Sequence, residues 1–239
     1  MLDGISKLTD IASKSSGVTA ITDHGNMFAA LLWQEAMYKE GKRAVFGFEA
    51  YAESIDGEKG KYHLILLAKN ETGLKNIMKL TSKSYGNMYY KPHVSLSDIR
   101  EYHEGIVCTS ACLGGEIARK IEKEYDEAKR VAEIYKKIFG ADYYLEIQRH
   151  GIEKESYINS QIIKLARELK IKLVAANDSH YINEGDKLPQ EIALCVAEGK
   201  QLDEPHFKFD GTDYYYMTDS EMINKFWDIP EAIESTLEI

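Results

Sequence analysis

The sequence predicts an α/β protein built around a largely parallel, barrel-like sheet. Short apolar runs of strand length alternate with helical segments along the whole chain, which is typical of βαβ units. The length of 239 residues suits a single α/β barrel. Acidic residues, histidines and a cysteine come at or just after the ends of these runs, where a barrel gathers its functional groups. We therefore expect a closed or nearly closed sheet with a functional site at one mouth.

Six runs have the length and composition of strands and are bounded by turn residues. The second and third are separated by the turn sequence 54–60, so we expect them to form a hairpin centred near Gly57. The expected strands are 17–21, 44–51, 62–68, 105–110, 143–148 and 171–174.

Helices are expected wherever apolar residues recur at spacings of three and four. Gly41 is placed to end one helix, Pro230 is placed to begin another, and the long charged segment should break near residues 124–126. The expected helices lie within 1–14, 27–40, 73–84, 97–102, 116–139, 154–169 and 187–198, with short helices beginning at Ser220 and Pro230.

The composition, 44% hydrophobic and 29% charged, is that of a soluble globular protein. No apolar run approaches the roughly 18 residues of a membrane span, and the N-terminus has no signal-peptide pattern. Three cysteines do not make a disulfide framework, so we expect a cytoplasmic protein. The net charge of −9 disfavours a domain that grips nucleic acid through its overall charge. If DNA is the partner, only a strand end needs to reach the site.

The stretch 171–180 carries the clearest candidate for a metal site. Asp178 and His180 closely follow the apolar run 171–174, which reads as a buried strand. Residues two apart in a strand point to the same side, so the two side chains are expected to converge. A carboxylate beside an imidazole suits Zn, Mn or Fe. The alternative is an acidic residue that starts a helix and a histidine on the surface.

Other strands also end in residues of the kinds that bind metals. Taken singly, each has a structural alternative, such as a turn, a surface position on an edge strand or a small buried thiol. Taken together, mixed oxygen, nitrogen and sulfur ligands suggest two or three divalent ions, which hold a phosphate, make hydroxide from water and stabilise the leaving oxygen. The residues alone therefore predict phosphoester hydrolysis. The hairpin is expected to bring His63 close to opposite Glu49. The further candidates are Asp23, His24, Glu49, His63, Cys112 and His150.

Two other features stay open. A locally basic strip is more typical of a solvated helix face than of a nucleic-acid track. Tyr85, Tyr89 and Tyr90 could stack on bases, but they could equally pack in the core or at an interface. The strip consists of Lys69, Lys75, Lys79, Lys83 and Lys91.

The order of several short motifs resembles a known family. The motifs are Thr22–Gly25, Gly47–Tyr51, Tyr62–Gly73, Tyr90–Pro92, Ser110–Glu116 and Asn177–Tyr181. With these motifs, the chain closely resembles the PHP (polymerase and histidinol phosphatase) domain that begins the alpha subunit of bacterial DNA polymerase III. The resemblance spans essentially all 239 residues. It implies a distorted seven-stranded PHP-type (βα) barrel, formed as a single domain by residues 1–239, without the polymerase palm region.

The resemblance also implies a site for up to three Zn, Mn or Fe ions. Its implied catalytic residues are His150, Asp178 and His180, with His150 either contacting phosphate or supporting the site from behind. The implied partners are the 3′ end of DNA, the rest of the alpha chain of a DNA-directed DNA polymerase and other subunits of its holoenzyme, with no membrane. The implied metal ligands are Asp3, His24, Glu49, His63, Cys112, Asp178 and His180.

One departure from the family changes these expectations. The family opens with a strand bearing His-x-His ahead of the motif seen here as Leu2-Asp3-Gly4, and Met1 falls inside that motif. We therefore expect the barrel to lack its first strand, with an open edge and fewer bound ions. Three functions remain: 3′–5′ exonuclease-type phosphodiester hydrolysis in DNA replication, a catalytically impaired docking module of the polymerase, and a stand-alone phosphatase of the histidinol-phosphate type.

Overall fold

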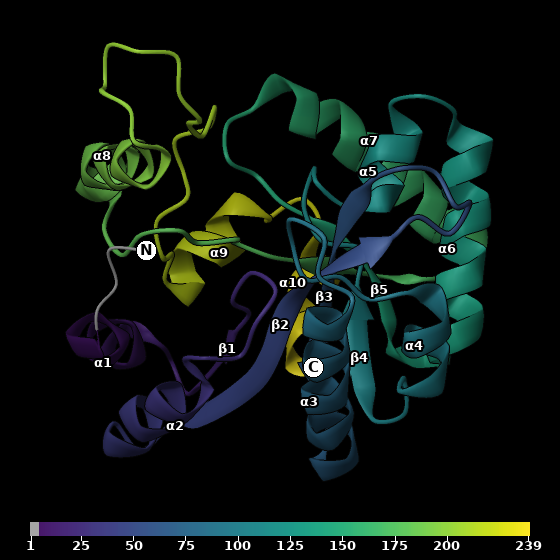
Figure 1. The fold of residues 1–239 in the computed structure, drawn as a ribbon, viewed down its shortest axis with the longest axis horizontal. Helices are drawn as coiled ribbons and strands as arrows, with labels where there is room; N and C mark the ends of the chain where they lie inside the picture. The colour runs from purple at the N-terminus through teal and green to yellow at the C-terminus, as the bar shows by residue number, and fades with distance from the viewer. Residues whose placement is uncertain (1–4) are drawn as a thin grey trace.

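The computed structural model describes residues 5–239, and its six strands form one curled sheet (Figure 1). The strands lie in chain order: β1 (Val18–Ile21), β2 (Arg43–Glu53), β3 (Lys61–Ala68), β4 (Ile106–Thr109), β5 (Tyr143–Ile147) and β6 (Lys172–Ala175). This arrangement confirms the predicted α/β fold of barrel type. Within residues 5–239 the sheet ends at β1 and β6, so it is a half-barrel rather than a closed one.

The sheet is more mixed than predicted. β1 pairs with β2, β4 with β5 and β5 with β6 in parallel, as βαβ units require. The β2–β3 hairpin forms as expected, and β3 then pairs with β4 in antiparallel orientation as well. The antiparallel part therefore lies in the middle of the sheet, with parallel strands on both sides.

The expected helices form, with some shifted ends. α2 begins three residues later than predicted, because the Asn26 side chain holds the preceding turn. Its oxygen accepts from the N–H of Phe28 and its amide donates to the carbonyl of His24, both at 2.9 Å. None of the helices described between residues 5 and 239 combines the length and the apolar character needed to cross a bilayer. The helices are α1 (Ile5–Lys14), α2 (Ala30–Lys39), α3 (Glu71–Gly86), α4 (Leu96–Glu101), α5 (Glu116–Ile121), α6 (Tyr125–Phe139), α7 (Glu153–Leu169), α8 (Lys187–Glu198), α9 (Asp219–Lys225) and α10 (Pro230–Glu234).

One face of the sheet packs against helices to form the main core. Side chains alternate along each strand, so Phe48, Leu66 and Leu145 all point to this face and are fully buried. Figure 1 shows α3 lying across the sheet beside β3 and β4, with α6 and α7 further along. A smaller core joins α1 and α2 to β1 through Trp33 and Met37.

The opposite face is apolar at one end and polar at the other. Because residues two apart share a face, the two ends belong to the same alternating rows of side chains. The apolar end is formed by Val45, Leu67, Val107, Tyr144 and Val174. The polar end is formed by Glu49, His63, Thr109 and Glu146. This polar end lies toward the C-terminal ends of β4, β5 and β6, and the candidate site forms there.

A close contact at Gly73 provides a test of this packing. A Cβ atom at Gly73, in the first turn of α3, would overlap the carbonyl oxygen of Gly105. Gly73→Ala is therefore expected to lower the free energy of unfolding by about 1–3 kcal/mol, because backbone must move to make room. Gly86 ends the same helix with open space around it, so Gly86→Ala is expected to cause no loss. Urea denaturation measures both variants, and equal midpoints would contradict the expectation.

Candidate metal centre

Four of the predicted ligands converge at the polar end of the sheet. Glu49 on β2, His63 on β3 and Cys112 after β4 place a carboxylate oxygen, a ring nitrogen and the sulfur within 4.8 Å of one another. Nδ1 of His24 lies 2.5 Å from Oε2 of Glu49, and Nδ1 of His63 contacts the other carboxylate oxygen. The same His63 nitrogen lies 3.4 Å from Sγ of Cys112. The cluster therefore draws on the turn after β1, two strands and one loop.

The hairpin has the predicted register, centred on Gly57, and it brings Glu49 and His63 close together. His63 pairs with Tyr51, and Glu49 pairs with Ile65. Glu49 and His63 are thus diagonal neighbours on one face and do not lie directly opposite each other. Diagonal neighbours in an antiparallel pair are within reach of long side chains, so the predicted placement of His63 close to opposite Glu49 is confirmed.

A tight loop holds Cys112 against His63. Ala111 has a φ of +58°, and the N–H of Gly114 donates to Sγ of Cys112 at 3.3 Å. The N–H of His63 donates to the carbonyl of Gly114 at 3.0 Å. A Cβ atom on Gly114 would lie 2.9 Å from the His63 ring, so the close approach requires glycine. Cys112 is therefore half-buried at the site and does not fill the apolar core.

Asp178 and His180 lie close together in a loop after β6 and not on the predicted strand. β6 ends at Ala175, and Asp178 has a φ of +46°, so the prediction that strand alternation aligns this pair was wrong. Oδ1 of Asp178 nevertheless lies 3.4 Å from Nε2 of His180. The His180 ring stacks on that of His24, with centroids 5.6 Å apart. The N–H of His180 donates to the carbonyl of Tyr214 at 2.7 Å, which ties this loop to a distant segment.

His150 lies behind the site, with both ring nitrogens engaged. Nδ1 is 2.6 Å from the Glu155 carboxylate and Nε2 is 2.6 Å from the carbonyl of Asn177. The buried ring also stacks on Tyr214 at a centroid distance of 4.0 Å. Burial lowers the pKa of His150, but the hydrogen bonds to Glu155 and Asn177 outweigh it and raise the pKa above its ordinary value. This geometry favours the supporting role for His150, because the His150 ring holds Asn177, the residue directly before Asp178.

The donor groups at the site suit a cation. Burial opposes ionisation of Glu49, but hydrogen bonds from His24 and His63 outweigh it and lower the pKa of the carboxyl to about 2. The hydrogen bond to Glu49 in turn raises the pKa of His24, against the effect of burial. Burial raises the pKa of the Cys112 thiol, so a cation is needed to hold it as a thiolate. A carboxylate, two imidazoles and a thiol are a donor set that fits zinc or a similar divalent ion.

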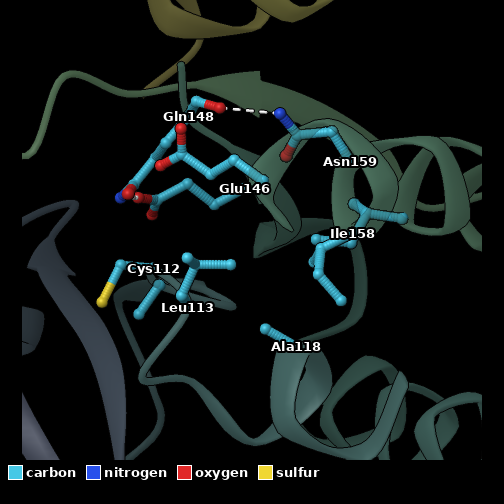
Figure 2. Close-up of a pocket in the computed structure, with 10 residues that line it drawn as sticks. Cys112, Leu113, Ala118, Glu146, Gln148, Ile158 and Asn159 are labelled. Carbon is cyan, nitrogen blue, oxygen red and sulfur yellow. Dashed lines mark hydrogen bonds between the residues drawn. The ribbon is translucent and has the colours of Figure 1, made fainter. Parts of the chain in front are cut away.

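Glu146 belongs to the surroundings of the site and was missed in the sequence. Its buried carboxyl accepts from the Thr109 hydroxyl and from Nε2 of Gln148, the latter at 2.6 Å, and burial raises its pKa to about 7. Figure 2 shows Glu146 and Gln148 beside Cys112, around a cavity of about 10 Å³, which has room for about one water. The dashed line marks the bond from Asn159 to the carbonyl of Gln148. The signal in the sequence was an acid within an otherwise apolar strand.

Asp3, another predicted ligand, lies outside the described residues. Among the described candidates, Asp23 does not join the cluster of contacts. Asp23 accepts from the N–H of Ala29, just ahead of α2, and burial raises its pKa. This is the turn role that was the alternative for Asp23, whereas its neighbour His24 faces Glu49.

Metal binding at this site is expected to compete with protons. The pKa of His24 is raised by Glu49, so its ring must lose a proton before the nitrogen can bind a metal. We expect the affinity for Zn²⁺ or Mn²⁺ to fall as the pH decreases through this raised pKa. Calorimetry in buffers of different ionisation enthalpy counts the protons released above and below it. Unchanged proton release in His24→Gln would show that His24 takes no part in this linkage.

The buried pair of His150 and Glu155 supports a separate prediction. In Glu155→Gln the charge facing the ring is lost, so we expect the pKa of His150, followed by NMR, to fall below that in the wild-type chain. The raised pKa stabilises the fold at low pH, and this contribution is lost as the pH rises through the folded-state pKa, so the variant should lose it. Glu153→Gln, at an exposed position of the same helix turn, is the control. An identical His150 titration in both variants would refute the assignment.

Comparison with known proteins places this geometry in a family. The profile of the PHP domain matches residues 1–150. The chain is 43% identical to the DNA polymerase III subunit alpha of Borreliella burgdorferi and 41% identical to that of Helicobacter pylori, in alignments that take in all of this chain. The alignments cover 22% of each relative, so the chain spans about a fifth of their length.

A solved structure shares the fold. It is that of a protein assigned as a metal-dependent phosphoesterase from Bifidobacterium adolescentis, with a TM-score of 0.50 over 93% of this chain and 90% of that one. The two sequences are 15% identical, so this likeness concerns the fold alone. Because the family profile matches more than half of the chain, the protein belongs to the PHP domain family.

Proposed function

We propose that this chain is the PHP part of a replicative DNA polymerase III alpha subunit and that its metal centre hydrolyses the phosphodiester bond at DNA 3′ ends. In this proposal residues 1–239 form one PHP domain. The observation that carries it is the approach of Glu49, His63 and Cys112 within 4.8 Å at the polar end of the sheet. Similarity to polymerase alpha subunits along the whole chain supports the setting in DNA replication.

The donor set fits one or more ions of Zn, Mn or Fe. Glu49, His63 and Cys112 would hold one ion, since their donor atoms already lie together. When bound, such ions orient a phosphate and activate water for attack on it. The donors that would extend the site are Asp3, by resemblance, and His24, Asp178 and His180, by their place beside the cluster.

The chain's own residues would prepare the substrate for this chemistry. Glu49 keeps its negative charge because two imidazoles hydrogen-bond it. His180 is partly exposed beside Asp178, so its ring can contact charge on the phosphate while the carboxylate orients it. His150 acts as a positioning residue, because its ring holds the Asn177 carbonyl.

A second function, as a docking module of the polymerase, is favoured by one observation. α8 exposes Leu188, Ile192 and Val196, which are spaced four residues apart and so share one face of the helix. An apolar stripe of this kind fits an interface with another part of the alpha chain or with another holoenzyme subunit. Docking and hydrolysis can coexist in one domain. The two proposals therefore differ only in whether the metal site also hydrolyses a phosphodiester.

Glu49→Gln tests the hydrolytic function. We expect the metal-loaded wild-type chain to shorten a single-stranded oligonucleotide from its 3′ end and to leave histidinol phosphate intact. The variant loses the carboxylate that joins the cluster, so its metal affinity should fall by more than about tenfold and hydrolysis should fall with it. Elemental analysis gives metal per chain, and gel electrophoresis gives the products.

Glu71→Gln is the matched control, since Glu71 is an exposed acid on α3. It should retain wild-type metal content and activity. If the chain binds metal but does not shorten the oligonucleotide, docking is the only proposed function that remains. Faster turnover of histidinol phosphate than of DNA would replace the proposal with a small-molecule phosphatase.

A further inference from the structure

The turn Tyr89–Lys91 next to the metal centre has a strained backbone and exposed side chains. Tyr90 has a φ of +58°, and the N–H of Lys91 donates to the carbonyl of Tyr89 at 2.7 Å. A hydrogen bond between residues two apart around a positive φ is typical of the rare, strained form of γ-turn. Tyr89 is 72% exposed and Tyr90 is 89% exposed, so burial of these rings does not offset the strain. Strain of this kind clusters at ligand-binding sites.

The turn is fixed to the metal centre by the residue that follows it. A Cβ atom on Gly25 would lie 3.1 Å from both the Pro92 ring and the Tyr51 ring, so these three residues are in close contact. Gly25 directly follows His24, and its N–H donates to the carbonyl of Glu49 at 2.8 Å. The segment after Pro92 then runs along β2, where it forms a parallel bridge to Ala52. The position of the turn relative to the metal ligands is thus set by the packing of Pro92 on Gly25 and Tyr51 and by the bridge to β2.

Lys91 brings a positive charge to the edge of the site. Its Nζ lies 4.5 Å from the centroid of the Tyr51 ring, and that ring meets His63 edge-on at 5.4 Å. Among the residues that the structure describes, no carboxylate lies within ion-pair distance of Lys91. By contrast, Lys83 of the same basic strip bonds both Asp98 and Glu101. An ammonium group without a carboxylate partner, beside a site for phosphate, is suited to bind another phosphate.

An apolar groove of about 390 Å³ lies between the residues that follow the His24 turn and the C-terminal half of α3. One wall is Met27 and Phe28, which follow the His24 turn, and the other is the Met78–Tyr85 stretch of α3, which leads toward the strained turn. The rings of Phe28 and Tyr85 lie 6.1 Å apart. Exposed aromatic rings of this kind stack on nucleobases without regard to sequence.

We propose that Lys91 and Tyr90 hold the single-stranded end of a nucleic acid at the metal centre, and that the groove lined by Phe28 and Tyr85 receives one of its bases. This inference rests on the proposed function and names how that site recognises its substrate. Lys91 binds the phosphate next to the one that is hydrolysed, and the Tyr90 ring stacks on a base. Because the chain carries a net charge of −9, such local contacts must replace attraction by the whole surface.

Lys91→Met and Tyr90→Gly test the inference in the metal-loaded chain. Glycine accepts the positive φ at position 90 and removes only the ring. Each variant should raise the KM for a single-stranded oligonucleotide by about tenfold, while kcat changes by less than about twofold. Turnover of bis(p-nitrophenyl) phosphate, a phosphodiester without neighbouring nucleotides, should stay unchanged. Tyr90→Phe keeps the ring and should restore the wild-type KM, and Lys75→Met on α3 is the control for loss of one positive charge.

Binding measured without hydrolysis separates this inference from the proposed function. Anisotropy of a labelled oligonucleotide with a phosphorothioate at its terminal linkage gives affinity and its salt dependence. Lys91→Met should weaken binding and make the slope against log salt shallower by about 0.7, whereas Lys75→Met should match the wild type. Absent binding in the wild type, or equal affinity and slope in the two lysine variants, would overturn the inference. Loss of hydrolysis alone, with the lysine difference retained, would overturn only the proposed function.

Discussion

The structure depends on one buried carboxylate that stays charged. Burial alone would favour a neutral Glu49, and only the imidazoles of His24 and His63 reverse that preference. The three residues come from the turn after β1, from β2 and from β3. The parallel pairing of β1 with β2 and the antiparallel pairing of β2 with β3 must therefore both be correct before the charge is compensated. The three residues therefore come together only in the correctly assembled sheet, and the sheet in turn positions the site.

The same alternation that builds the core also builds the site. One row of side chains on β2 to β6 is buried by helices, and the other row passes from an apolar end to a polar end. Close approach of β2 and β3 is helped by Gly47, where any Cβ atom would overlap the Leu66 carbonyl oxygen. Glu49 is two residues further along, on the face that carries His63. A slip of either strand by one residue would turn its ligand toward the helices and separate Glu49 from His63, so the register is under strong physical constraint.

The sequence allowed the strands, most helices and the cluster of Glu49, His63 and Cys112 to be predicted, because each follows from local periodicity and turn residues. It did not allow the details that depend on distant partners. Asp178 has a left-handed backbone conformation in a loop that is bonded to the Tyr214 segment. No local sequence pattern predicts this contact with a distant segment. Glu146 was missed because the other residues of β5 are apolar and the strand as a whole reads as core. By contrast, the turn residues 54–60 located the centre of the hairpin at Gly57, and this register places Glu49 and His63 diagonally on one face.

The two sides of the centre are consequently held by different forces. Glu49 and His63 lie within the strand ladder, where backbone hydrogen bonds fix them, so changing their geometry means disrupting the sheet. Asp178 and His180 lie beyond β6, outside the sheet. They are placed by the backbone bond from His180 to the Tyr214 carbonyl and by the His150 side chain, which bonds the Asn177 carbonyl and stacks on Tyr214. Substitutions in this supporting layer can move one side of the site while the fold persists. Natural variation that alters the metal centre without loss of the domain should therefore concentrate around His150 rather than along β2 and β3.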